Sequence, residues 1–476
     1  MFDLIVLGGG PGGYLAAERA GQAGLAVLLI EKDKLGGVCL NEGCIPSKTL
    51  LNGAKIYEYA LHGKAYGVTV ESARYDPAVA VKRKNKVVRG LVAGIKQQLK
   101  QHGVAVVSGE GQIISREPGR ITVQAGNEQY SSRWLIIATG SEPVIPPITG
   151  IQEGLESGFV LTSREMLDLE QIPEQLVVIG GGVIGLEMAS LYQSIGSQVA
   201  IVEMLDQLAG QADREQVGLL QRQLEKKGMQ VFLQSRVSRV SGDGVEFQQD
   251  GETKWLNAEK ILLSVGRRPR IRGIGLENIG VYTEKGRIVT DAQGRTNWPD
   301  VYAVGDVNGL WMLAHAAYRE AEVAIASILG ENDRMSYDAM PSVIYTQPEL
   351  ASVGLTADAC REKGIPYLEV RLPMQYSGRF MAENAQAGGQ IHLLVHPRRQ
   401  ILLGCHLLGS YASEIILTAG MMIEHQMPLS EIKKFIFPHP TVVEIIREAV
   451  FRLPETGTPA GDQPTDEHDS ITGGKV

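Results

Sequence analysis

Two of the four cysteines of this 476-residue chain lie close together in the sequence. Cys39 and Cys44 are separated by four residues, and Gly43 gives the backbone the freedom to bring the two thiols together in a small disulfide loop. Lys48 follows Cys44 by four residues, so both side chains share one face of a helix. A nearby lysine lowers the pKa of a thiol and favours the reactive thiolate. We therefore expect a redox-active pair, in a helical stretch that Pro46 distorts, rather than two buried structural thiols.

A histidine and a glutamate near the other end of the chain are candidates for moving a proton. His439 lies between two prolines, and Glu444 follows it by five residues. Histidine is suited to proton transfer near neutral pH, and a carboxylate can fix its tautomer and raise its basicity. The alternative is a histidine with a structural role in a proline-rich turn. The other cysteines, Cys360 and Cys405, have no comparable surroundings, and we interpret them as ordinary core or surface residues.

An internal repeat predicts the elements that would position these groups. Residues 4–7 form an apolar strand that leads into a Gly-x-Gly-x-x-Gly turn, a helix and a second strand, and residues 176–179 begin the same pattern again. The offset is 172 residues at the first glycine (8 to 180) and at the acid that ends the second strand (31 to 203). This constant register indicates two copies of one unit. The glycines of the two turns are Gly8, Gly10, Gly13 and Gly180, Gly182, Gly185.

Each copy has the residues that a bound dinucleotide requires. The first glycine permits a tight turn, the second lets the backbone approach a pyrophosphate, and the third lets helix and strand pack closely. The helix N-terminus presents free N–H groups to the phosphates. Glu31 and Glu203 each follow the last glycine by 18 residues, where a carboxylate can accept hydrogen bonds from ribose hydroxyls. Glu203 would repel a 2′-phosphate, and no basic residue occurs between it and Arg214, which favours NAD over NADP.

The charge distribution argues against nucleic acid as a partner. The formal net charge is −8, and the last 23 residues, 454–476, hold five acids and one base and so carry half of it. This segment is rich in Pro, Gly, Thr and Asp, and we expect it to be disordered. The remaining chain is close to neutral, unlike a typical nucleic-acid-binding surface. We interpret the one basic run as a solvated helix face, and it comprises Lys82, Arg83, Lys84, Lys86 and Arg89.

Neither a targeting segment nor a membrane span is evident in the sequence. Met1-Phe2-Asp3 continues directly into the first apolar strand, which is too short and wrongly flanked for a signal peptide. No apolar run approaches the roughly 20 residues that cross a bilayer. We expect a cytoplasmic protein or a mature organellar one, with two or three domains and no metal site.

The segment around the cysteines resembles a known family. Residues 36–48 are Gly-Gly-Val-Cys-Leu-Asn-Glu-Gly-Cys-Ile-Pro-Ser-Lys, and they resemble the redox-active segment of the class I pyridine nucleotide–disulfide oxidoreductases. The similarity extends from Leu4 to about Leu453. The Ile-Pro-Ser-Lys ending resembles the dihydrolipoamide dehydrogenase branch, whereas glutathione reductases more often have Val-Pro-Lys-Lys there. Glu42 departs from the small apolar residue of the family pattern, and the added charge is expected to shift the potential of the disulfide.

The resemblance implies an α/β fold with two Rossmann-like dinucleotide-binding domains and a C-terminal α+β dimerisation domain. The FAD-binding domain would be split in two, with the NAD-binding domain inserted between its parts. The implied boundaries are 1–142 and 270–340 for the FAD-binding domain, 143–269 for the NAD-binding domain, 341–453 for the interface domain and 454–476 for the acidic tail.

The resemblance also implies roles for single residues. Cys39 would be the interchange thiol that meets the substrate, and Cys44 the inner thiol that contacts the flavin. Lys48 would lie beside the flavin ring, paired with Glu187 of the second unit. The residues implied to contact FAD are Gly8, Gly10, Gly13, Glu31, Lys48, Gly111, Thr139, Gly140, Asp306 and Ala314, and those implied to contact NAD are Gly180, Gly182, Gly185, Glu187, Glu203 and Gly266.

The implied reaction oxidises protein-bound dihydrolipoamide and reduces NAD through FAD. His439 and Glu444 would be the acid–base pair, supplied by the other subunit of a homodimer. The implied partners are the lipoyl domains and acyltransferase core of a 2-oxoacid dehydrogenase complex, or the lipoyl carrier protein of glycine cleavage. One alternative is a related NAD(P)H-dependent disulfide reductase, against which Glu203 argues. Another is a docking subunit with an idle flavin, against which the intact Cys39 and Cys44 argue.

Overall fold

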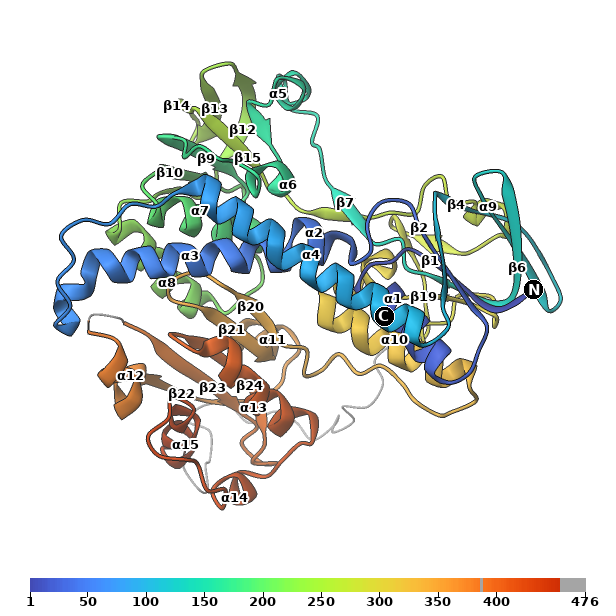
Figure 1. The fold of residues 1–476 in the computed structure, drawn as a ribbon. Coiled ribbons are helices and arrows are strands. Elements are labelled where there is room, and N and C mark those ends of the chain that lie inside the picture. Colours follow the sequence, from blue (N-terminus) through green and yellow to red (C-terminus); the bar gives the residue numbers. More distant parts are fainter. Residues whose placement is uncertain (386–387, 454–476) are drawn as a thin grey trace.

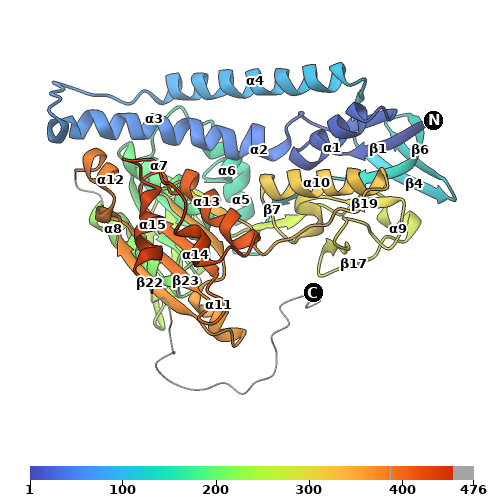
Figure 2. The same cartoon turned by 90° about the horizontal axis from the view of Figure 1, so that it is seen from below.

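A computed structural model describes residues 1–385 and 388–453 of the chain (Figures 1 and 2). Three sheets of five or more strands form its body. The predicted acidic tail, residues 454–476, lies outside the described residues.

The first repeat builds a sheet whose central strands are parallel. Its strands are β1 (Phe2–Leu7), β2 (Val27–Glu31), β3 (Ala105–Ser108), β4 (Gly111–Glu117), β5 (Arg120–Ala125), β6 (Glu128–Ile137) and β19 (Val301–Ala303). The order is β3-β2-β1-β6-β5-β4, and β19 also pairs with β6. Leu4, Ile5 and Val6 are fully buried, because β1 is a central strand with both faces covered.

Two helices that are far apart in the sequence pack together on this sheet. They are α1 (Pro11–Gln22) and α10 (Ala314–Ile328), and they run side by side in Figure 2. Ala16, Ala17 and Ala20 of α1 are buried in one cluster with alanines of α10. These small side chains let the two backbones approach closely.

A helical excursion between β2 and β3 carries the cysteines. It consists of α2 (Gly37–Glu42), α3 (Cys44–His62), the 3-10 turn η1 (Gly63–Tyr66) and α4 (Pro77–Gln101). The helix is interrupted at Gly43, which has φ −144° and ψ −106°. The expected distortion at Pro46 is wrong: Pro46 lies in the first turn of α3, where a missing N–H costs no intrahelical hydrogen bond.

The basic run on α4 is only partly solvated, which corrects the prediction for Lys84. Lys84 is 2% exposed. Its Nζ donates to the carbonyl of Leu167 at 3.0 Å and forms an ion pair with Asp168. The other four basic residues of the run are exposed. Lys84 therefore joins α4 to the second repeat instead of facing water.

The second repeat builds a fully parallel five-stranded sheet, in the order β11-β10-β9-β15-β8. These strands are β8 (Val160–Leu161), β9 (Gln175–Ile179), β10 (Gln198–Val202), β11 (Gln230–Phe232) and β15 (Lys260–Leu263). Its helices are α5 (Ile151–Ser157), α6 (Ser163–Met166), α7 (Val183–Ser194) and α8 (Arg214–Lys226). A small antiparallel sheet contains β12 (Arg236–Ser241), β13 (Gly244–Gln249) and β14 (Glu252–Asn257).

The two segments by which the chain enters and leaves the second unit lie next to each other. The two crossing strands, β7 (Ser141–Pro143) and β16 (Arg267–Pro269), pair antiparallel, and Figure 1 shows β7 between the two units. The return segment contains α9 (Leu276–Ile279), β17 (Thr283–Glu284), β18 (Arg287–Ile288) and the 3-10 turn η2 (Gly305–Asn308).

The C-terminal part is an antiparallel sheet with helices, in the order β20-β21-β24-β23-β22. Its strands are β20 (Ser342–Ile344), β21 (Leu350–Gly354), β22 (Leu368–Pro373), β23 (Gln390–Val395) and β24 (Leu402–Leu408). Its helices are α11 (Ala357–Glu362), η3 (Met374–Tyr376), α12 (Gly378–Glu383), α13 (Ala412–Glu424), α14 (Leu429–Ile432) and α15 (Glu444–Phe451). Cys405 is buried in the core of this part, and Cys360 in a small separate cluster.

The predicted fold class is confirmed, with two Rossmann-like units and a C-terminal α+β part. In the described part of the chain, no helix is both long and apolar enough to cross a membrane. The same residues contain no cluster of three or more His, Cys, Asp or Glu side chains that could hold a metal ion.

Candidate active site

The two cysteines lie on either side of the helix break. Cys39 belongs to α2, and Cys44 is the first residue of α3. Both are free, partly buried thiols, and each influences the pKa of the other. The neighbouring Cys44 and burial raise the pKa of Cys39, whereas the neighbouring Cys39 and the charge of Lys48 lower the pKa of Cys44. The thiolate is therefore favoured at Cys44, at a helix N-terminus, and the proton remains on Cys39.

Lys48 and Glu187 form an ion pair where α3 meets α7. The Nζ atom of Lys48 lies 2.9 Å from both carboxylate oxygens of Glu187. Glu187 is 4% exposed, so it is not a solvated residue on the surface of its helix. A carboxylate in such a position needs a partner for its charge. The structure thus brings together two predicted site residues that are 139 positions apart in the sequence.

Both dinucleotide turns hold their acid in the same way. Glu31 accepts hydrogen bonds from the backbone N–H of Gly9 at 2.5 Å and of Asp33 at 2.7 Å. Glu203 accepts the equivalent bonds from Gly181 at 2.6 Å and Leu205 at 2.8 Å. Each carboxylate oxygen keeps a second lone pair that can accept a bond from a ribose hydroxyl.

The glycines of the two turns have two roles: some allow close packing of helix and strand, and others leave space for a dinucleotide. A Cβ on Gly13 would lie 1.8 Å from the carbonyl oxygen of Gly8, and a Cβ on Gly185 would lie 2.0 Å from that of Gly180. These contacts let helix and strand pack tightly. A Cβ on Gly182, by contrast, would meet nothing within 4 Å, which leaves room for a pyrophosphate at the start of α7. Gly10 is similarly placed at the start of α1.

The predicted FAD residue Asp306 is linked to both crossing strands. It lies in η2 and accepts a hydrogen bond from the hydroxyl of Ser141 in β7. Arg267 of β16 donates to the same hydroxyl at 2.8 Å and to the Ser141 carbonyl at 2.9 Å. Burial lowers the pKa of Arg267, and Asp306 opposes this effect. Nearby, Thr139 donates to the carbonyl of Arg270 at 2.7 Å.

The remaining predicted contact residues lie at element ends. Gly140 and Gly266 have φ of +72° and +117°, and a Cβ on either would meet nothing within 4 Å. Ala314 is the first residue of α10. Gly111 begins β4, and a Cβ there would lie 2.6 Å from a methyl of Leu7, so Gly111 packs against the first sheet.

His439 and Glu444 lie together in the C-terminal part. The Nδ1 atom of His439 is 3.0 Å from Oε1 of Glu444, whose other oxygen accepts the backbone N–H of Thr441 at 2.8 Å. The backbone bond and His439 lower the pKa of Glu444, although burial opposes them. The His439 side chain is 78% exposed. Across the described residues, no hydrogen bond or ion pair joins it to Cys39 or Cys44 of the same chain.

Comparison with known families identifies this arrangement. Residues 2–321 match the family model described as pyridine nucleotide-disulphide oxidoreductase, and residues 340–450 match its dimerisation domain. The chain belongs to this family. Similar curated proteins include a dihydrolipoyl dehydrogenase of Mycoplasma pneumoniae, 36% identical over 94% of this chain and 97% of that protein. One from Bacillus subtilis is 37% identical over 94% of this chain and 95% of that protein.

Solved structures of the family share the fold. The HOCl-induced flavoprotein disulfide reductase RclA from Escherichia coli has a TM-score of 0.84 and 27% identity, covering 95% of this chain and 100% of that chain. LpdA from Mycobacterium tuberculosis has the same TM-score at 26% identity, covering 94% and 99%. The predictions of a flavin-dependent oxidoreductase that uses FAD and NAD, and of a homodimer, are confirmed at the level of the family.

Three residues near the site were not predicted from the sequence. Ser141 and Arg267 lie in motifs that the family resemblance covers, but the hydroxyl–guanidinium contact gives no sequence signal. Glu320 of α10 is buried, and it accepts bonds from the backbone N–H of Gly305 at 2.6 Å and the side chain of Asn308 at 2.8 Å. It thereby fixes both sides of Asp306. An acid in an alanine-rich helix gives no indication of this role.

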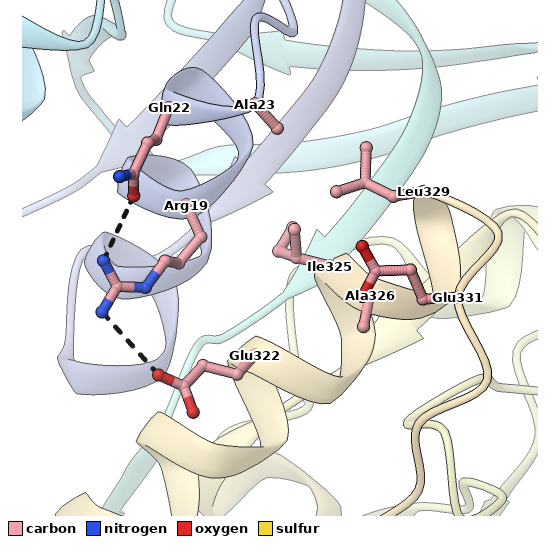
Figure 3. Close-up of a pocket in the computed structure, with 8 residues that line it drawn as sticks. All are labelled: Arg19, Gln22, Ala23, Glu322, Ile325, Ala326, Leu329 and Glu331. Carbon is pink, nitrogen blue, oxygen red and sulfur yellow. Dashed lines mark hydrogen bonds and ion pairs between the residues drawn. The ribbon is translucent and has the colours of Figure 1, made fainter.

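A hollow of about 270 Å³ lies between α1 and α10 (Figure 3). In the figure, Arg19 reaches from α1 toward Gln22 and Glu322, and the corresponding distances are 3.3 and 3.7 Å. Ile325 and Leu329 form the apolar side. None of the predicted site residues lines this hollow, so it is separate from the redox centre.

Proposed function

We propose that this chain is a dihydrolipoyl dehydrogenase. The observation that carries the proposal is the Cys39–Cys44 pair at the N-terminus of α3, beside a lysine that is paired with Glu187. A stabilised thiolate at one of two neighbouring cysteines is what dithiol–disulfide exchange with a second dithiol requires. The shared name of the curated relatives supports the substrate.

In the proposed reaction, the oxidised enzyme has a Cys39–Cys44 disulfide. His439, oriented by Glu444, takes a proton from one thiol of dihydrolipoamide. The resulting thiolate attacks Sγ of Cys39, which forms a mixed disulfide and releases Cys44 as a thiolate. The second substrate thiol loses its proton, and its sulfur attacks the substrate sulfur of the mixed disulfide. The bond to Cys39 breaks, and the leaving Cys39 sulfur takes this proton through His439. Lipoamide leaves, and the enzyme keeps the reduced Cys39 thiol and the Cys44 thiolate.

The cofactors would lie on the two turns. FAD would be held by Gly8, Gly10, Gly13, Glu31, Lys48, Gly111, Thr139, Gly140, Asp306 and Ala314, and NAD by Gly180, Gly182, Gly185, Glu187, Glu203 and Gly266. When bound, the flavin supplies a two-electron acceptor for the dithiol and a hydride donor for the nicotinamide. The protein itself holds Cys44, Lys48 and the two turns in fixed positions relative to one another.

The proposal extends to architecture and surroundings. The domain division is 1–142 with 270–340 for FAD, 143–269 for NAD and 341–453 for the interface. His439 would act on the cysteines of the partner subunit, which fits its exposed side chain. The partners would be the lipoyl domains and acyltransferase core of a 2-oxoacid dehydrogenase complex, or a lipoyl carrier protein, in the cytoplasm.

The test is NAD reduction by the purified protein with dihydrolipoamide, with NADP as the control cofactor. We expect NAD-selective turnover that Cys44→Ser abolishes. Co-expression of Cys44→Ser and His439→Gln subunits then tests the shared site, because only mixed dimers contain one site with both groups intact. Restored turnover supports the exchange of His439 between subunits, and its failure with intact dimers contradicts it.

A related disulfide reductase is the second candidate, favoured by the name of the structurally similar RclA. Such an enzyme would oxidise NADH or NADPH and reduce a disulfide substrate. A protein whose flavin is reduced by NADH but that does not turn over dihydrolipoamide would support this candidate instead.

A further inference from the structure

A third residue holds the Lys48–Glu187 ion pair, and it comes from the C-terminal part of the chain. Tyr345 directly follows β20, whose last residue, Ile344, is buried in the core of the second unit. The backbone N–H of Tyr345 donates to Oε1 of Glu187 at 3.1 Å. Its ring faces Nζ of Lys48, which lies 4.4 Å from the ring centroid.

These two contacts act on different partners of the ion pair. The backbone bond fixes one oxygen of Glu187 within its buried site. The ring attracts the ammonium group through its quadrupole, as a cation–π contact. Lys48 therefore lies between a carboxylate and an aromatic face. Lysine has a flexible four-carbon stem, so an ion pair alone leaves its Nζ atom several positions.

The position of Nζ matters because Cys44 responds to it. The charge of Lys48 is one of the causes that lower the pKa of Cys44. Burial, with Glu349 and Glu187 close by, raises the pKa of Tyr345. The phenol therefore stays neutral, and its ring does not add a negative charge beside the thiolate.

We propose that Tyr345 is a positioning residue that keeps the Lys48 ammonium beside Cys44, through its ring and its bond to Glu187. The redox thiol is thus coupled to the C-terminal part, which no motif around the cysteines indicates. The inference rests on the proposed function only in taking Cys44 as the redox thiol. It requires no particular substrate.

The experiment measures how fast iodoacetamide alkylates Cys44 in the reduced, full-length holoenzyme as a function of pH. Fragment-ion mass spectrometry separates Cys44 from Cys39. Tyr345→Leu removes the ring and keeps the backbone bond. We expect it to raise the pKa of Cys44 by about half a unit to one unit, the size of one lost cation–π contact.

Two matched variants separate positioning from general stability. Tyr345→Phe keeps the ring, and Ile344→Val loosens the same strand by one methylene; both should leave the Cys44 profile within about 0.2 units of the wild type. Tyr345→Met replaces Tyr345→Leu if the latter does not fold. An unshifted profile in the ringless variant, or an equal shift in either control, overturns the proposal. Because the readout is a thiol pKa, failure to oxidise dihydrolipoamide would affect the proposed function alone.

Discussion

The two dinucleotide units share a turn but differ in the segment that packs beside it. In both units, the loop after the second strand returns to the turn and forms a backbone hydrogen bond with it. In the first unit the N–H of Gly36 donates to the carbonyl of Gly9 at 2.8 Å, and in the second the N–H of Ala209 donates to the carbonyl of Gly181 at 2.9 Å. At the next residue the units diverge. Gly37 has φ +55°, and a Cβ there would lie 2.7 Å from Cα of Gly10. Gly210 has φ +60°, and a Cβ there would meet nothing within 4 Å.

This difference separates a covered turn from an open one. In the first unit, the start of α2 packs on the turn, and the cysteines come immediately after it. In the second unit, the space beside Gly182 stays free. The first arrangement suits a cofactor that stays with the protein and must touch the dithiol. The second suits one that enters and leaves in every catalytic cycle. One turn geometry therefore serves both purposes, and the neighbouring segment decides which.

The largest effect is expected when the third glycine of each turn is replaced. Gly13→Ala and Gly185→Ala place a methyl within about 2 Å of a backbone carbonyl, so helix and strand must separate. We expect Gly13→Ala to lose flavin absorbance per chain. Gly185→Ala should stay yellow and lose at least about 100-fold in kcat/KM for NAD. Equal loss of flavin in both variants would contradict the independence of the two units.

A pH effect should be confined to the first unit, because Glu320 supports only that unit. Burial raises the pKa of Glu320 from 4.5 to about 7. Its stabilising contribution is complete below about pH 4.5, where the acid is protonated in both states, and is lost as pH rises through 7. The difference corresponds to about 3 kcal/mol.

Melting curves of the wild type and Glu320→Gln at pH 5.5 and 8.5 measure this effect. The amide keeps the shape and cannot ionise, so the melting temperature of Glu320→Gln relative to wild type should rise by several degrees between the two pH values. Parallel changes in both proteins would rule out a titrating Glu320. NAD affinity should not follow the same pH dependence.

The covering of the first turn can be tested with two alanine substitutions that have the same backbone cost. Gly37→Ala and Gly210→Ala both place a side chain at positive φ, which costs about 1 kcal/mol. Only Gly37→Ala also meets Cα of Gly10. We expect the strained backbone and this contact together to weaken the free energy of flavin binding by about 2 kcal/mol. The flavin released on dilution measures this loss. Release that is equally raised in Gly210→Ala would show that the contact is unimportant.

The open turn should set the choice of nicotinamide through Glu203. Glu203→Gln removes the charge that faces a 2′-phosphate, while its remaining oxygen can still accept one backbone bond. We expect the ratio of kcat/KM for NAD over NADP to fall about 10-fold, equivalent to about 1.4 kcal/mol. Glu31→Gln is the matched control in the covered turn and should leave this ratio unchanged.

The smallest effect concerns Glu42, whose charge follows Cys39 on α2. Its carboxylate lies 3.2 Å from Arg164 of α6, so most of the charge is balanced. We therefore expect Glu42→Val to shift the dithiol potential by less than about 30 mV, or 1.4 kcal/mol for two electrons. A redox titration that resolves a few millivolts measures this small but non-zero shift, and a potential unchanged within that precision would contradict a role of Glu42 at the redox centre.

Local patterns in the sequence predict the parts of the fold that depend on near neighbours. The two repeats follow from glycines and apolar strands within about thirty residues, and His439 and Glu444 are only five positions apart. The prediction for Lys84 is wrong because its partner Asp168 is 84 positions away. The predicted distortion at Pro46 is wrong because proline destabilises a helix only in its interior. Pro46 lies in the first turn of α3, where its missing N–H has no intrahelical partner to lose.

The contacts of Tyr345 could not be predicted for a similar reason. An aromatic residue after a short apolar strand indicates core, and only the folded chain brings it to Lys48 and Glu187. The same applies to Glu320, whose partners lie in η2 and whose burial has no local cause.

The ion pair between Lys48 and Glu187 also has a consequence for biosynthesis. Its two residues are 139 positions apart, and the ring that faces Lys48 is supplied by residue 345. A nascent chain that has exposed only its first hundred residues contains both cysteines but neither of these partners. Its thiols therefore emerge from the ribosome before the ion pair exists. The Lys48 ammonium can be held between Glu187 and the Tyr345 ring only after the C-terminal part has been synthesised and has folded onto α3.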